Sequence, residues 1–227
     1  MSVGFRIFAL GDSALTVEFG NEISVELNER AIALSDYFES HPFPGFIETV
    51  PAYASTTIFF DIARVRVAFP AASTAFDAVR GLVDDALKNA NQTQSNEPQM
   101  IEIPVHFDSG SALDLEYVAV THDLSTCEVV DIFMSRVYRV YMLGFLPGFT
   151  YMADVDERIA TPRKDTPRTA VPKGSVGIAS RQTGIYSLES PGGWQIIGRT
   201  EIEMFTPAVE RPTLFRPGDS VRFVPAK

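Results

Sequence analysis

Two short, turn-rich segments in the second half of the sequence carry polar groups suited to holding a small ligand. Gln182-Thr183-Gly184 and Ser190-Pro191-Gly192-Gly193 bring an amide, hydroxyls and glycine backbone N–H groups close together along the chain. Such groups hydrogen-bond a carboxylate or an amide, and they also close tight turns. The residue types therefore leave two alternatives, a binding site or two structural turns.

Arginines near these segments offer a positive counterpart. Arg163, Arg168 and Arg199 form a candidate anion clamp, because a guanidinium binds a carboxylate through two parallel hydrogen bonds. Residues 1–135 carry 6 basic and 20 acidic side chains, whereas residues 136–227 carry 13 basic and 9 acidic ones. The basic half either binds an anionic ligand or an acidic partner, or simply has a different solvated surface.

Aromatic side chains also gather in this region. Phe145, Phe149 and Tyr151 flank the turn formers Pro147-Gly148, and Trp194, the only tryptophan, follows the second glycine-rich segment. Trp194 is either a core residue of a β-barrel or a stacking platform for a ligand. Exposing three aromatic rings around one turn is unfavourable in a monomer, so we expect a pocket wall or a partner interface there.

Signatures of independent catalysis are sparse. The sequence has no glycine-rich phosphate loop, and His41, His106 and His122 do not show metal-ligand spacing with the lone Cys127, so no metal site is expected. Cys127 lies among apolar residues of a predicted helix, which predicts a buried structural thiol. A single cysteine cannot form an internal disulfide, in keeping with a reducing cytoplasm.

Charge and hydropathy exclude other classes of protein. The net charge of −10 argues against general binding to nucleic acid, because phosphate backbones require a basic surface. No apolar run reaches the roughly 18 residues needed to cross a bilayer, and the N-terminus lacks the layout of a signal peptide. We therefore expect a cytoplasmic protein that contacts neither nucleic acid nor a membrane.

Hydrophobic periodicity predicts a small α+β domain over residues 1–89. The expected elements are strands 5–9 and 14–19, a helix over 23–38, strands 46–53 and 56–62, and a helix over 76–87, with Thr74 or Ser73 as a cap of the last. The order ββαββα places both helices on one face of an antiparallel sheet, which is a ferredoxin-like arrangement.

A polar segment, residues 90–99, reads as a linker to a second domain over 100–227. We expect a strand over 100–105, helices over 112–119 and 126–135 with Ser125 as the cap of the latter, and short strands with tight turns from residue 137 onward. This pattern is typical of a mostly β barrel or sandwich.

Several long motifs resemble one family. They are Gly11–Leu15, Val50–Tyr53, Tyr138–Phe149, Pro167–Ala179, Gln182–Tyr186, Ser190–Thr200 and Pro217–Phe223. Together they resemble the B subunits of 5-oxoprolinase, a family that includes allophanate hydrolase subunit 1 and a sporulation histidine-kinase inhibitor. The resemblance covers nearly the whole chain and implies a cyclophilin-like barrel as the second domain.

The resemblance also implies a function. Subunits of this family work with a C-type, carboxyltransferase-like subunit and an A-type subunit to hydrolyse 5-oxo-L-proline to L-glutamate at the expense of ATP. The chain would then hold no cofactor, ATP would be used by the assembled complex, and the isolated chain would be inactive. The alternatives are a non-catalytic histidine-kinase inhibitor and a subunit that processes allophanate or a urea amide.

Within this hypothesis we expect one site shared with the C-type subunit. The expected substrate-binding residues are Arg163, Arg168, Lys173, Gln182, Thr183, Gly192, Gly193, Trp194 and Arg199. The expected partner interface consists of Phe145, Pro147, Phe149 and Tyr151.

The chain departs from the family pattern in one region. Where relatives have Tyr-Gly-Gly-Glu, it has Phe107-Asp108-Ser109-Gly110, and Phe133 stands where a helix histidine is common. A titratable group is thus missing where acid–base chemistry would be placed. Either Asp108 or His106 replaces it, or the chain has kept binding and lost catalytic competence.

Overall fold

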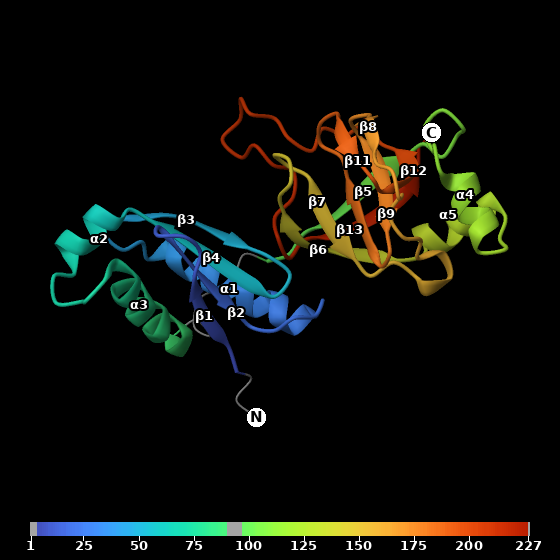
Figure 1. The fold of residues 1–227 in the computed structure, drawn as a ribbon. Helices are drawn as coiled ribbons and strands as arrows, with labels where there is room; N and C mark the ends of the chain where they lie inside the picture. The colour runs from blue at the N-terminus through green and yellow to red at the C-terminus, as the bar shows by residue number, and fades with distance from the viewer. Residues whose placement is uncertain (1–3, 90–96, 227) are drawn as a thin grey trace. The chain divides into compact units, whose positions relative to one another are not determined.

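The chain folds into two compact units, Met1–Glu97 and Pro98–Lys227, hereafter the N-terminal and the C-terminal unit. A computed structural model describes residues 4–89 and 97–226 (Figure 1). Most of the predicted linker, residues 90–99, lies outside the described residues. No helix within the described ranges is both long and apolar enough to cross a membrane.

The N-terminal unit is an antiparallel four-stranded sheet covered by helices. Its sheet has the order β1-β2-β4-β3. The elements are β1 Arg6–Ala9, β2 Ala14–Glu18, α1 Val25–Ser40, β3 Phe46–Pro51, β4 Ser55–Phe60, α2 Ile62–Ala68 and α3 Ala75–Asn89. Leu34 of α1 and Val79 of α3 pack in one hydrophobic core with Ile58 of β4. The predicted α+β arrangement is confirmed, and the narrower ferredoxin-like description stays a prediction.

Helix α2 is a correction to the sequence analysis, which extended a strand to residue 62. Strand β4 ends at Phe60, and the Asp61 carboxylate accepts a hydrogen bond from the Arg64 backbone N–H at 2.9 Å. This contact caps α2 at its N-terminus. Only Val65 of this short helix is buried, so the sequence has no helical periodicity to detect.

Gly81 offers a test of helix propensity in the N-terminal unit. It lies in α3 on an exposed face, and a Cβ added there would meet no atom within 4 Å. Gly81→Ala should therefore raise the free energy of unfolding by about 0.5–1 kcal/mol. Urea titration followed by circular dichroism measures the change. Gly45→Ala is the matched control and should destabilise, because Gly45 has φ +97° and the Asp61 carbonyl oxygen lies 3.0 Å from the added Cβ. Loss of stability in Gly81→Ala would contradict the prediction.

The C-terminal unit is a nearly closed barrel, as expected. Its seven-stranded sheet has the order β12-β9-β10-β7-β6-β13-β5. Backbone hydrogen bonds between His106 and Arg199 then join the two edges. The strands are β5 Met100–Val105, β6 Val137–Leu143, β7 Thr150–Ala153, β9 Ser175–Ala179, β10 Gln182–Ile185, β12 Gln195–Arg199 and β13 Ser220–Pro225. A separate pair is formed by β8 Arg168–Val171 and β11 Ser190–Gly192.

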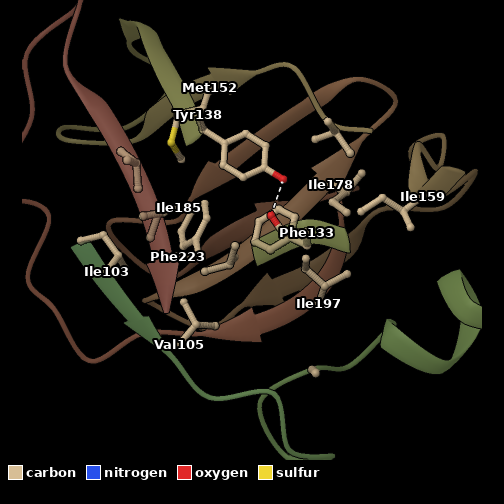
Figure 2. Packing of buried hydrophobic residues seen from close by; sticks show 14 of the residues in the cluster. Ile103, Val105, Phe133, Tyr138, Met152, Ile159, Ile178, Ile185, Ile197 and Phe223 are labelled. Carbon is tan, nitrogen blue, oxygen red and sulfur yellow. Dashed lines mark hydrogen bonds between the residues drawn. The ribbon is translucent and has the colours of Figure 1, made fainter. Parts of the chain in front are cut away.

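Helices α4 Leu115–Thr121 and α5 Thr126–Met134 pack against this barrel and contribute to its core (Figure 1). Figure 2 shows Phe133 of α5 among the barrel residues, where its carbonyl oxygen accepts a hydrogen bond from the Tyr138 hydroxyl at 2.9 Å. Phe133 also stacks on Phe223 with ring centroids 4.8 Å apart. The side chain at position 133 is therefore a core residue and lies away from solvent.

The prediction for Cys127 was wrong, because this thiol is exposed. Helix α5 begins with a capping box in which Ser125 and Glu128 hydrogen-bond each other's backbone N–H groups. Val129 and Phe133 form the buried face of the helix, whereas Cys127 lies in the first turn on the exposed side. Apolar neighbours in the sequence did not indicate which face the cysteine occupies.

Candidate functional site

The connection between β6 and β7 consists of two successive turns. The Leu146 N–H donates to the Gly144 carbonyl at 2.7 Å across Phe145, which has φ +64°. This is a γ-turn of the rare, strained form. The Phe149 N–H then donates to the Leu146 carbonyl at 3.0 Å, and Gly148 has φ +76°. Proline followed by glycine with positive φ defines a type II turn.

These turns place two aromatic rings edge to face, 5.4 Å apart, with one exposed and the other buried. Phe145 is 60% exposed, whereas Phe149 is 1% exposed and packs edge-on against Tyr186 and Trp194 at 5.1 and 5.5 Å. The predicted interface is therefore corrected: Phe149 is a core residue and cannot contact a partner in this fold. Phe145 and Pro147 are exposed, and Tyr151 is half-buried.

Phe149 belongs to a second hydrophobic cluster, which we call the outer cluster. Its buried members are Phe149, Val171, Ala179, Tyr186, Trp194 and Ile196. Successive strand residues face opposite sides of a sheet, and Ile178 and Ile197, which neighbour members of this cluster, lie in the barrel core instead. The outer cluster therefore covers the outside of the barrel.

Glycines allow the indole of Trp194 to lie on this outer surface. A Cβ added at Gly184 would lie 3.1 Å from the Trp194 ring and 2.6 Å from the Thr150 carbonyl oxygen, and one at Gly177 would lie 3.0 Å from Trp194 Cβ. Trp194 is 5% exposed, so it is a buried residue, but it lies in the outer cluster and not in the barrel core where the first alternative placed it.

Arg168 is held by a carboxylate that the sequence analysis missed. Asp114, 4% exposed, accepts hydrogen bonds from Arg168 Nη1 and Nη2 at 2.8 and 2.7 Å. It also accepts from Lys164 Nζ at 3.1 Å and from the Ile196 N–H at 2.7 Å. Arg168 is therefore committed to an ion pair. Because the two partners lie 54 residues apart in sequence, no local pattern pointed to Asp114.

The groups around Asp114 favour its ionised form. Burial raises the pKa of its carboxyl, but the hydrogen bonds from Arg168, the Ile196 N–H and Lys164 outweigh that effect and hold the pKa below its usual range. A charged Asp114 thus ties the start of α4 to β12, to the first residue of β8 and to Lys164 in the segment before β8.

The remaining members of the predicted clamp do not meet. Trp194 lies just before the first residue of β12, and Arg199 is the last residue of that strand. Arg199 Nε donates to the Lys173 carbonyl at 3.0 Å, and the Lys173 ammonium pairs with Glu203. The cations predicted to bind substrate are therefore divided between two places, and Arg163 and Arg168 lie at the Trp194 end.

Arg163 differs from its neighbours. Its guanidinium lies over the Trp194 ring, 5.6 Å from the centroid. Among the described residues, no carboxylate lies within ion-pair distance of it. A guanidinium stacked on an indole keeps its N–H edge available for a planar anion.

Thr183 and Gly192, which belong to the two turn-rich segments, have structural roles. Thr183 is fully buried and donates its hydroxyl to the Gly177 carbonyl at 2.9 Å, so it cannot contact substrate as predicted. Gln182 is half-buried at the start of β10. A Cβ at Gly192 would lie 2.3 Å from the Tyr186 hydroxyl oxygen, whereas at Gly193 the nearest atom is 3.6 Å away. Gly192 therefore makes room for the Tyr186 hydroxyl.

The two candidates for acid–base chemistry have other roles. Asp108 accepts hydrogen bonds from the Ser111 hydroxyl at 3.0 Å and from the Gly110 N–H at 2.9 Å. The Ser111 hydroxyl, then the Gly110 N–H, lower the pKa of Asp108, so this carboxylate closes its own turn as an anion. His106 closes the barrel through its backbone.

The α+β unit and the barrel together form one module of a known domain family. The chain belongs to the family described as carboxyltransferase domain, subdomains C and D, whose model matches residues 5–215. The family resemblance inferred from the motifs is thereby confirmed.

Two similar proteins are B subunits of 5-oxoprolinase. That of Bacillus subtilis is 44% identical over 225 residues, covering 99% of this chain and 94% of the relative. That of Escherichia coli O157:H7 is 36% identical, covering 98% and 96%. Urea amidolyase of Saccharomyces cerevisiae is 26% identical over 95% of this chain but only 13% of its own length.

Solved structures with this fold include longer chains. TTHA0988 superposes with a TM-score of 0.81 at 37% identity, covering 94% of this chain and 40% of that one. PH0987 from Pyrococcus horikoshii has a TM-score of 0.56 at 41% identity and 98% coverage of both chains. Urea carboxylase of Kluyveromyces lactis, at 22% identity and a TM-score of 0.75, shares the fold over 22% of its length.

Proposed function

We propose that this chain is the B-type component of a cytoplasmic 5-oxoprolinase, which opens 5-oxo-L-proline to L-glutamate with ATP. The observation that carries the proposal is the 44% identity to the B-type component of a bacterial 5-oxoprolinase along 99% of the chain. The similarity to urea amidolyase covers only a small part of that longer protein at 26% identity, so it supports a shared fold more than a shared substrate.

Partner subunits follow from the same proposal. In TTHA0988 and in urea carboxylase, this module occupies 40% and 22% of a longer chain, so it occurs covalently joined to other segments. In this chain, Phe145 and Pro147 project from a rigid double turn, and an exposed aromatic ring on a rigid turn is suited to anchor a partner. We assign that partner to the C-type subunit, with an A-type subunit completing the enzyme.

Within the complex, this chain supplies binding groups. Asp114 is saturated by cations and Asp108 by its own turn, so neither carboxylate is free to take a proton from water or substrate. The exposed Arg163 can bind and orient an anionic group of a substrate. The proton transfers and the use of ATP are assigned to the partner subunits, which makes the isolated chain inactive.

Reconstitution tests the function. The chain, co-expressed with C-type and A-type subunits of a 5-oxoprolinase, should release glutamate from 5-oxo-L-proline only when ATP is present. Mixtures that omit this chain are the control and should be inactive. A folded, co-eluting complex that releases no glutamate would contradict the proposal, and hydrolysis of allophanate by the same complex would favour the urea-amide alternative.

A further inference from the structure

Arg163 stands out among the cations of the C-terminal unit because it has an aromatic ring where its neighbours have carboxylates. Lys164 and Arg168 pair with Asp114, and Arg181 pairs with Asp154. Arg163 instead lies over Trp194, with no acidic partner among the described residues. An exposed guanidinium held in this way is a ready site for an external carboxylate.

The backbone on both sides of Arg163 is anchored. The Pro162 carbonyl accepts a hydrogen bond from the buried Gln195 amide at 2.9 Å, and the Lys164 N–H donates to the Gly193 carbonyl at 2.7 Å. The pairing of Lys164 and Arg168 with Asp114 holds the following residues in place. Arg163 is therefore preorganised, so binding an anion requires little further loss of conformational entropy.

An aromatic side chain lies next to the ring that carries Arg163. Tyr151 is half-buried, and its ring centroid lies 5.8 Å from that of Trp194. Burial raises the pKa of the Tyr151 hydroxyl and the Arg163 charge only partly opposes that effect, so this side chain is neutral at pH 7.

We propose that Arg163, which lies over Trp194 beside Tyr151, binds the carboxylate of the substrate. This assignment rests on the proposed function, in which the substrate is a cyclic amide that carries a carboxylate. Holding the carboxylate at this place fixes one end of the molecule and leaves its lactam carbonyl for groups of the partner subunit.

Kinetics of the assembled enzyme test the role of Arg163. Arg163→Gln should raise KM for 5-oxo-L-proline about tenfold to a hundredfold, the usual effect of losing a charge-assisted hydrogen bond, with kcat unchanged within about threefold. Arg163→Lys should recover part of the loss. Arg216→Gln, at an exposed arginine elsewhere in the unit, is the matched control and should behave as wild type. An unchanged KM in Arg163→Gln would overturn the proposal.

Trp194 provides a readout independent of activity, because it is the only tryptophan of the chain. In the full chain alone, 5-oxo-L-proline should change Trp194 fluorescence, its amide 5-oxo-L-prolinamide should not, and Arg163→Gln should abolish the response. Equal responses to acid and amide, or no response to either, would overturn the proposal. A carboxylate-specific response without glutamate release by the complex would reject the proposed function alone. Glutamate release with a wild-type KM in Arg163→Gln would reject the carboxylate site alone.

Discussion

Replacing Phe149 with aspartate should unfold the C-terminal unit. Phe149 is 1% exposed and its ring contacts Phe145, Tyr151, Tyr186 and Trp194 at centroid distances of 4.7–5.5 Å. Removing a buried phenylalanine side chain costs about 3–5 kcal/mol, and burying an unpaired carboxylate costs more. The sum approaches the whole stability of a typical domain. Urea unfolding monitored by Trp194 fluorescence should therefore show no cooperative transition.

Phe145→Asp is the matched comparison. Phe145 is 60% exposed, so the charge stays in water and the unfolding free energy should fall by no more than about 1 kcal/mol. Co-purification with the C-type subunit should nevertheless be lost, because the variant places a charge at the centre of the proposed contact. A cooperatively folded Phe149→Asp chain would contradict the burial argument, and full retention of the partner by Phe145→Asp would remove that residue from the interface.

Asp114→Asn should destabilise the C-terminal unit by about 3–5 kcal/mol, because it leaves the partly buried cations Arg168 and Lys164 without their counter-charge. Asparagine has nearly the same shape, so the loss reports the charge. Asp108→Asn is the control: Asp108 is exposed and its partners belong to its own turn, so a change below about 1 kcal/mol is expected. Urea unfolding at pH 7 measures both. Equal stability of the two variants would show that the Asp114 ion pairs contribute little.

The stability difference between wild type and Asp114→Asn should also depend on pH. The folded state holds the pKa of Asp114 below its ordinary value of 3.8, so its contribution to stability is complete above that pH and is lost as the pH falls through the folded pKa. The stability difference between wild type and Asp114→Asn should therefore be constant near neutrality and shrink on acidification below about pH 4. A difference that stays constant into strong acid would contradict this assignment.

Local patterns accounted for most elements of the fold. The buried positions Leu27, Ala31 and Leu34 recur at helical spacing and correspond to α1. Ser125 caps α5 as its sequence predicted, and the Pro-Gly pair at 147–148 forms the turn expected of it. These features depend on interactions between residues a few positions apart, so the sequence displays them directly. Helix α2 was not predicted, because its single buried residue, Val65, forms no periodic hydrophobic pattern.

The candidate site was only partly predictable. Arg163, Arg168 and Trp194 were expected to share a site, and they do lie at one end of β12. Their roles were not predictable, because Arg168 forms an ion pair with Asp114, which lies in a distant segment of the sequence. Phe145 and Phe149 are chemically identical and flank the same turn, yet one projects into solvent and the other lies in the outer cluster.

The sequence by itself determined the family, the two-part α+β and barrel organisation, and the turns, since these follow from motifs, periodicity and local backbone preferences. Only the tertiary structure decided which arginine keeps a free guanidinium, which aromatic ring stays exposed and why Gly192 must be glycine. Those outcomes depend on burial and on ion pairs between segments far apart in the chain. Such contacts form only when the barrel closes and the outer cluster packs on it.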